Sequence, residues 1–391
     1  MVTGSRRDLL NNQRDCMEKV LPPARTMSRR RFLKGLGAGI FVTGLNGMLP
    51  LPAWALASPR KLHEGLAGYA PQTHFDLAFR DTAIAIDGRQ GRATAINGSV
   101  PAPLLRWREG SEVTLDVSNH LEDAAHASIH WHGVLVPFRM DGVPGVNFNG
   151  IQPGETYRYR FPVKQAGTYW YHSHSRFQEQ SGAYGPIIID PKDGEPFRYD
   201  REHVVMLSDW AFEDPETIYR NINLDPDYYI YYQRTLFDYL HDVREKGFGD
   251  ANAELLPFRK MNMSSRDLSN VTGSIYTYLV NGHSPDMNWT GMFEPGETVR
   301  LRFINASAMS NFDVRIPGLD MRVVSADGRR VRPVDCHEFR IGVAETYDVL
   351  VRPEESRAYT IFAESLDRSG FARGTLAPEP GMEAEVPRMR P

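Results

Sequence analysis

The feature that most constrains the fold of this chain is an internal repeat of one pattern. Residues 97–119 contain Asn-Gly-x-x-Pro and then Gly-x-x-Val-x-Leu-x-Val-x-Asn. Residues 281–305 contain Asn-Gly-x-x-Pro and then Gly-x-x-Val-x-Leu-x-Phe-x-Asn. Alternating apolar and polar residues are typical of half-buried β-strands, because successive side chains of a strand point to opposite faces. The repeat therefore predicts two domains that share one β-rich fold.

Composition supports an all-β chain. The 391 residues include 33 Gly and 27 Pro, which separate many short apolar runs. Such runs favour antiparallel strands in Greek-key β-sandwich domains. We expect the first domain to span residues 65–195 and the second residues 200–378, with residues 379–391 as a linker stub. The formal net charge of −4 gives no reason to expect nucleic-acid binding.

One segment of the second domain breaks the β pattern. The β pattern breaks over about residues 211–270, and from Tyr228 to Lys246 the chain is rich in aromatic side chains, with apolar residues at an irregular helical spacing. Asp214 followed by Pro215 is a typical helix start, with the aspartate as N-cap and the proline in the first turn. The sequence therefore predicts a partly helical insertion in this part of the chain.

Residues 1–58 have the character of an N-terminal extension with an export signal. Residues 28–34 match the twin-arginine pattern, with Arg29 and Arg30 as the arginine pair. An uncharged stretch with small-residue cleavage sites follows, and its glycines and prolines make it a poor stable membrane span. We expect the twin-arginine machinery to export the protein to the bacterial periplasm. Either Met1 or Met27 could be the true start.

Two His-x-His pairs carry the chemistry of the chain. His130 and His132 form one pair, His172 and His174 the other, and each pair lies in a segment that we expect to be a β-strand. Period-two alternation points both imidazoles of a pair to one face. A single pair is more often structural, but two pairs on neighbouring strands predict a metal site. Imidazole ligands alone favour copper, zinc, iron or nickel over calcium or magnesium.

These residues resemble the multicopper oxidase family. His-Trp-His-Gly followed by a strand ending in His-Ser-His is the N-terminal half of the family signature. Residues 137–145 and 177–186 are similar to its copper-resistance protein A branch, and the resemblance covers about residues 65–380. It implies tandem cupredoxin-like domains, with copper as cofactor in a trinuclear cluster that reduces dioxygen to water.

The resemblance also implies a role for each histidine. His130 corresponds to the ligand of the type 2 copper. His132 and His172 correspond to ligands of one ion of the type 3 pair, and His174 to a ligand of the other. Apart from these ligands, no catalytic residue is expected.

The second copy of the repeat has lost these histidines. Residues 358–365 align with residues 167–175 after one gap, and the alignment places Phe362 and Glu364 at the ligand positions. The segment around Asp313, which corresponds to His-Trp-His, contains no histidine. We therefore predict that the second domain keeps the fold without a metal site.

The sequence lacks one part of the family signature. In the family, a type 1 copper takes electrons from substrate and is held by one cysteine and two histidines. That cysteine lies in a His-Cys-His-x-x-x-His motif, whose histidines complete the trinuclear cluster. This sequence has only Cys16 and Cys336, and neither lies in such a motif. We expect only half of the cluster ligands here and no third domain, either because the sequence is truncated or because that domain is genuinely absent.

Two functions remain open at this point. The intact family couples oxidation of Cu(I) or phenols to reduction of dioxygen, and this chain would supply the oxygen-reducing half. The alternative is a non-catalytic periplasmic protein that binds or sequesters copper with the same histidines. Whether the chain is itself an enzyme is left open. Copper ions and dioxygen are the expected partners, together with a separate third domain or other copper-resistance proteins.

Overall fold

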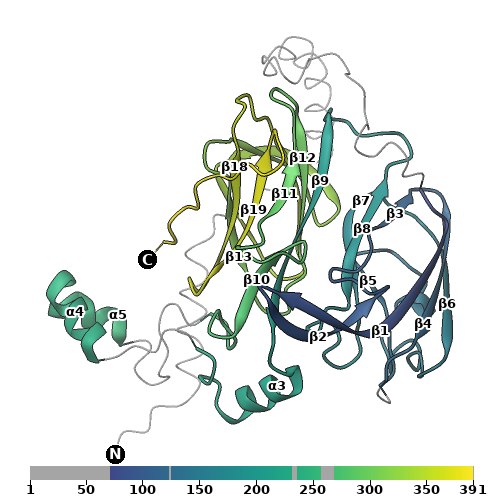
Figure 1. Cartoon of the computed structure of the whole chain (residues 1–391), viewed down its shortest axis with the longest axis horizontal. Coiled ribbons are helices and arrows are strands. Elements are labelled where there is room, and N and C mark those ends of the chain that lie inside the picture. Colours follow the sequence, from purple (N-terminus) through teal and green to yellow (C-terminus); the bar gives the residue numbers. More distant parts are fainter. Residues whose placement is uncertain (1–70, 123–124, 231–235, 257–267, 391) are drawn as a thin grey trace, which may run out of the picture. The chain divides into compact units, whose positions relative to one another are not determined.

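The computed structural model describes residues 71–122, 125–230, 236–256 and 268–390 (Figure 1). All of them belong to one compact unit, Ser58–Pro391. The export motif with Arg29 and Arg30 lies outside the described residues. Among the described residues, none of the helices combines the length and the apolar character that crossing a membrane requires.

The strands of the N-terminal half form two four-stranded sheets with the orders β2-β1-β4-β6 and β3-β8-β7-β5. The strands of the first sheet are β1 (His74–Ile86), β2 (Arg89–Ile96), β4 (Glu112–Asn119) and β6 (Thr156–Pro162). Those of the second are β3 (Leu105–Arg108), β5 (His130–His132), β7 (Gly167–His172) and β8 (Tyr184–Asp190). Strand β4 shows the expected alternation, because Val113, Leu115 and Val117 are fully buried while the residues between them are not.

The strands of the C-terminal half form two larger sheets. The first has the order β10-β9-β12-β17-β14-β15 and the second the order β11-β19-β18-β13-β16. The strands of the first are β9 (Arg201–Ala211), β10 (Tyr276–Val280), β12 (Val299–Asn305), β14 (Met321–Ala326), β15 (Arg329–Cys336) and β17 (Thr346–Val351). The strands of the second are β11 (Trp289–Met292), β13 (Phe312–Arg315), β16 (Glu338–Ile341), β18 (Tyr359–Ser365) and β19 (Phe371–Ala377). The all-β prediction is confirmed.

Each half has its own apolar core. In the first, Trp107 and Trp131 pack edge to face with ring centroids 5.8 Å apart, and both are fully buried. In the second, Phe303 and Phe312 lie in the core formed by the two larger sheets. Because Trp131 lies between His130 and His132 on β5, burying its indole on the inner face turns both histidines to the opposite face.

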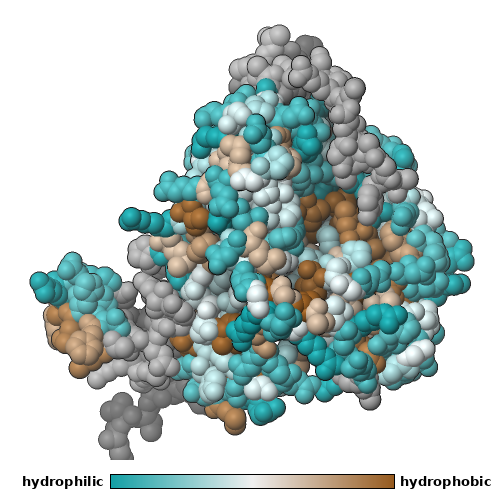
Figure 2. Space-filling view, viewed as in Figure 1, coloured by the Kyte–Doolittle hydropathy of each residue, from teal (hydrophilic) through white to brown (hydrophobic). Residues whose placement is uncertain are grey.

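The predicted helical insertion contains α3 (Pro215–Leu224), α4 (Leu236–Lys246) and α5 (Phe248–Leu255). Helix α3 begins as expected, because the Asp214 carboxylate accepts a hydrogen bond from the backbone N–H of Thr217 at 2.9 Å. Figure 2 shows hydrophobic side chains gathered on the α4–α5 hairpin, where Phe237 and Phe248 are exposed. The partly helical insertion is thus confirmed.

Candidate metal centre

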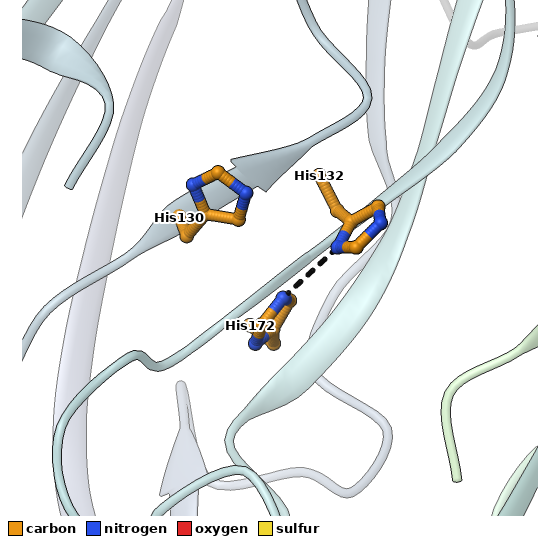
Figure 3. A group of neighbouring side chains, drawn as sticks. All are labelled: His130, His132 and His172. Carbon is orange, nitrogen blue, oxygen red and sulfur yellow. Dashed lines mark hydrogen bonds between the residues drawn. The ribbon is translucent and has the colours of Figure 1, made fainter. Parts of the chain in front are cut away.

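Strands β5 and β7 bring the two histidine pairs together. They are antiparallel neighbours, with His130 opposite His172 and His132 opposite Trp170. Figure 3 shows the imidazoles of His130, His132 and His172 converging from these two strands. One nitrogen from each of the three lies within 4.8 Å of the others. The structure therefore gathers three of the four histidines that the sequence singled out.

The fourth histidine stands beside this group. The ring centroid of His174 lies 5.6 Å from that of His130 and 5.8 Å from that of His172. His174 is exposed, and its backbone N–H donates to the buried hydroxyl of Ser128 at 2.9 Å. The backbone of His174 is therefore fixed, and its ring lies about as far from those of His130 and His172 as these two rings lie from each other, 5.5 Å.

The hydrogen-bond partners indicate which ring nitrogens can bind a metal. His130 Nδ1 lies 2.8 Å from the backbone carbonyl oxygen of Asp141, which can only accept. His172 Nδ1 lies 2.7 Å from a carboxylate oxygen of Glu179 and 3.1 Å from the carbonyl oxygen of Ser173. Both Nδ1 atoms therefore carry the hydrogen, and in a neutral imidazole the lone pair is then on Nε2.

Burial keeps the imidazoles of His130 and His132 neutral. Desolvation, together with the charges of the nearby His172 and His130 rings, lowers the pKa of His132 to about 4. Desolvation also lowers the pKa of His130, although its hydrogen bond to Asp141 opposes this shift. A neutral imidazole offers its lone pair without first losing a proton, so both residues are ready to bind a metal near pH 7.

The spacing of two nitrogens fits one metal ion. His132 Nδ1 and His172 Nε2 are 3.2 Å apart. Two metal–nitrogen bonds of about 2.0–2.1 Å at a tetrahedral angle separate their nitrogens by roughly 3.3–3.4 Å. Trp170 stacks on both rings, with centroid distances of 5.0 Å to His132 and 4.3 Å to His172. The donor set and its spacing therefore fit a metal that prefers imidazole, copper included.

A second group of possible ligands is less suited to a metal. His74, Asp76 and Asp116 also place one ligand atom each within 4.8 Å of one another, and His74 and Asp76 are exposed. The Asp116 carboxylate, however, already accepts two hydrogen bonds from Arg158, at 2.6 and 2.7 Å. A guanidinium group thus occupies the place of a cation, so this group is a surface ion-pair cluster.

The second sandwich has the same strand arrangement without histidines. Strands β13 and β18 pair with Asp313 opposite Glu364 and Arg315 opposite Phe362. By this register Glu364 corresponds to His172 and Phe362 to Trp170, so the expected alignment was wrong by two residues. Arg390 Nε donates to the buried carboxylate of Glu364 at 2.9 Å. Carboxylate–guanidinium pairs have replaced the imidazoles.

Two acceptors at the site were missed by the sequence analysis. Asp141 lies in the loop that follows β5, and Glu179 lies in the turns between β7 and β8. Neither occurs in a His-x-His pattern, and their spacing from His130 and His172 depends on the path of these loops. The sequence near them offers no separate signal.

The chain is similar to known copper proteins over most of its length. Two family models, both described as multicopper oxidase, match residues 78–194 and 257–380. The chain is 55% identical over 369 residues to a copper resistance protein A homolog of Pseudomonas syringae pv. tomato, covering 94% of this chain and 61% of that protein. It is 51% identical over 364 residues to copper resistance protein A of Escherichia coli, covering 93% of this chain and 59% of that protein. The chain thus spans about three fifths of the length of these relatives.

Solved structures show the same architecture. The blue copper oxidase from Nitrosomonas europaea matches with a TM-score of 0.58 and 26% identity, covering 78% of this chain and 85% of that one. The laccase from Botrytis aclada matches with a TM-score of 0.59 and 26% identity, covering 81% of this chain and 55% of that one. These similarities confirm the expected tandem cupredoxin-like sandwiches.

Proposed function

The chain belongs to the multicopper oxidase family, and we propose that it provides the copper-binding, oxygen-reducing half of a copper-resistance oxidase. The proposed ligands are His130, His132, His172 and His174. The observation that carries this proposal is the convergence of three imidazole nitrogens within 4.8 Å on adjacent strands. When bound, copper in such a centre supplies electrons for the reduction of dioxygen to water.

The residues of this chain would hold and orient the metal. His130 and His172 each use Nδ1–H to bind an acceptor of the protein, which leaves Nε2 for the metal. The indole of Trp170 covers the rings of His132 and His172 on one side and keeps water from that side. The strand pairing fixes these rings before any metal arrives, which lowers the entropy cost of binding.

Localisation, domain limits and partners extend this proposal. The twin-arginine motif at Arg29 and Arg30 supports export to the periplasm, and the names of the relatives support a role in copper resistance. We retain residues 65–195 and 200–378 as the two domains. Copper ions and dioxygen are the proposed partners, with a separate third domain or other copper-resistance proteins as further candidates.

A non-catalytic copper-binding protein is the second candidate. It is supported by the convergence of three imidazole nitrogens within 4.8 Å, which is enough to bind a metal ion without turnover. The same histidines would then bind copper without turnover. Oxygen consumption by the copper-loaded protein, measured with an artificial electron donor, would rule out this second function, because a protein that only binds copper does not reduce dioxygen.

The ligand assignment is tested by copper content. We expect His130→Ala and His174→Ala to lower the copper retained per chain after dialysis, measured by elemental analysis, with an unchanged circular dichroism spectrum. His120→Ala is the matched control, because His120 is an exposed histidine of the same sandwich. Unchanged copper content in both ligand variants would contradict the assignment.

A further inference from the structure

A carboxylate lies directly behind one of the proposed ligands. Glu179 Oε2 is 2.7 Å from His172 Nδ1, and the His172 side chain is 8% exposed. His130, by contrast, has a backbone carbonyl as its nearest acceptor at 2.8 Å, and the Asp141 carboxylate lies further away at 3.4 Å. Of these two rings, His172 is therefore the one whose Nδ1 lies in close contact with a carboxylate as well as with a backbone carbonyl, that of Ser173.

Two acceptors determine which nitrogen of His172 carries the lone pair. The Ser173 carbonyl oxygen lies 3.1 Å from Nδ1 and the Glu179 carboxylate lies 2.7 Å from it, so Nδ1 must carry the hydrogen. The lone pair is then on Nε2, the atom that lies 3.2 Å from His132 Nδ1. The negative charge also increases electron density on the imidazole, which makes Nε2 a stronger donor to a metal ion.

The residues on either side of Glu179 are anchored to different sandwiches. Gln178 accepts from the Ser173 hydroxyl at 2.7 Å and donates to the carbonyl oxygen of His126 at 3.0 Å, both within the first sandwich. Gln180 donates to the carbonyl oxygen of Asp209 on β9 at 3.1 Å.

Gln180 also accepts from the Tyr276 hydroxyl on β10 at 2.9 Å. The second sandwich thus fixes one side of the turn, and the first sandwich fixes the other. Glu179 is held against His172 before any metal binds.

We infer that Glu179 is a positioning residue for the metal centre, which fixes the tautomer of His172 and strengthens its Nε2 as a ligand, with the second sandwich holding the turn in place. This inference rests on the proposed function. It also gives the second sandwich, which lacks histidines at the equivalent strands, a part in building the centre. Loss of such a carboxylate partner typically costs about 10–100-fold in metal affinity.

The first measurement uses the metal-free protein. Nitrogen-15 NMR of histidine-labelled protein reports which nitrogen of His172 carries the hydrogen, with His172→Ala to assign the signal. We expect Nδ1–H in the unsubstituted protein, and in Glu179→Ala we expect a measurable share of the other tautomer, because the Ser173 carbonyl oxygen is then the one acceptor left beside Nδ1. Glu179→Gln keeps an acceptor without the charge, so it should keep the Nδ1–H tautomer.

The second measurement is the affinity for Cu(II), by competition with a chelator, together with the electron paramagnetic resonance spectrum of the bound ion. We expect Glu179→Ala to weaken binding by about 10–100-fold and to change the spectrum, with Glu179→Gln between it and the unsubstituted protein. Glu112→Gln is the control, because Glu112 pairs with Arg160 on the surface of the same sandwich.

The outcomes separate the two proposals. If His172→Ala abolishes copper binding while both Glu179 variants keep the affinity and the spectrum, the inference is overturned and the proposed function stands. If His172→Ala retains full copper binding, the proposed function itself fails. Should Glu179→Ala unfold, Glu179→Gln decides, because an unchanged affinity and spectrum in that folded variant contradicts a role for the charge.

Discussion

Among single residues, Gly142 controls the backbone partner of His130. Its φ of +78° lies in the left-handed region, and a Cβ at this position would collide with the carbonyl oxygen of Ile129. The preceding carbonyl, that of Asp141, accepts from His130 Nδ1 at 2.8 Å. We predict that Gly142→Ala lowers both the melting temperature and the copper content, because relieving the collision moves the Asp141 carbonyl.

A control separates this collision from backbone strain. Gly154 has a φ of +80° and open space around its Cβ position. Gly154→Ala should therefore cost only the strain of a left-handed residue, about 1–2 kcal/mol, with copper content unchanged. Calorimetry measures the stability of Gly142→Ala and Gly154→Ala, and elemental analysis measures their copper content. Equal losses of stability in the two variants would contradict a collision at position 142.

For single residues, the sequence predicted the face of the sheet to which a side chain points better than it predicted which residues that side chain contacts. Period-two alternation placed His130 and His132 on one face, and the structure agrees. His174 lies beyond the last residue of β7, so alternation no longer fixes its ring, and its nitrogens lie outside the group of three. Glu179 could not be predicted, because the turns between β7 and β8 bring it back to His172.

Among the secondary-structure elements, β7 is attached to the second sandwich through a buried threonine. The Thr168 hydroxyl donates to Asp348 at 2.6 Å and accepts from Arg302 at 2.8 Å. Thr168→Val keeps the shape but leaves both charged groups with one hydrogen bond fewer. We predict a loss of about 1–3 kcal/mol in the free energy of unfolding, measured by urea titration.

A surface threonine is the matched control for this prediction. The Thr156 hydroxyl pairs with that of Ser118 at 2.7 Å on an exposed part of β6. Thr156→Val should change stability by no more than about 0.5 kcal/mol. The strand pairing around His172 does not involve the Thr168 hydroxyl, so Thr168→Val should retain its copper. Equal destabilisation by Thr168→Val and Thr156→Val would contradict a stabilising role for the buried hydrogen bonds of the Thr168 hydroxyl.

Strand positions were predictable, but their pairing was not. Apolar alternation located β4 and β12 in the two repeats. Strand β4 buries one face, whereas every residue of β12 is buried, including the polar Arg300 and Arg302 that alternate with its apolar residues. Register depends on the partner strand, which a single sequence does not contain. The pairing of Asp313 with Glu364 therefore corrected the alignment of the repeats. The arginines that neutralise these carboxylates come from distant parts of the sequence, as Arg390 does, so their pairing could not be predicted either.

Across the whole molecule, buried ion pairs link the two sandwiches. Arg106 on β3 donates to Glu202 on β9 at 2.6 Å, and Arg302 on β12 donates to the same carboxylate at 2.9 Å. Burial alone would raise the pKa of Glu202, but the charges of Arg302 and Arg106 lower it to about 2. The Glu202 carboxylate therefore remains ionised in the folded protein until strongly acid pH.

The direction of the pH dependence follows from this shift. An unfolded glutamate has a pKa of about 4.3, so the stabilisation from ionised Glu202 is fully present above that pH. It is lost as the pH falls from about 4.3 towards 2, because over this range the unfolded state binds a proton that the folded state does not. We predict that Glu202→Gln costs about 3–5 kcal/mol at pH 7, since it leaves two buried guanidinium groups with less counter-charge.

Urea unfolding followed by tryptophan fluorescence at several pH values tests this prediction. The stability difference between the unsubstituted protein and Glu202→Gln should be largest near pH 7 and should shrink below about pH 4.3, because the unfolded glutamate then binds a proton and the unfolded glutamine cannot. Glu112→Gln removes a surface carboxylate that pairs with Arg160, and it should show neither effect. A difference that stays constant from pH 7 to pH 3 would mean that the charge of Glu202 contributes nothing to holding the sandwiches together.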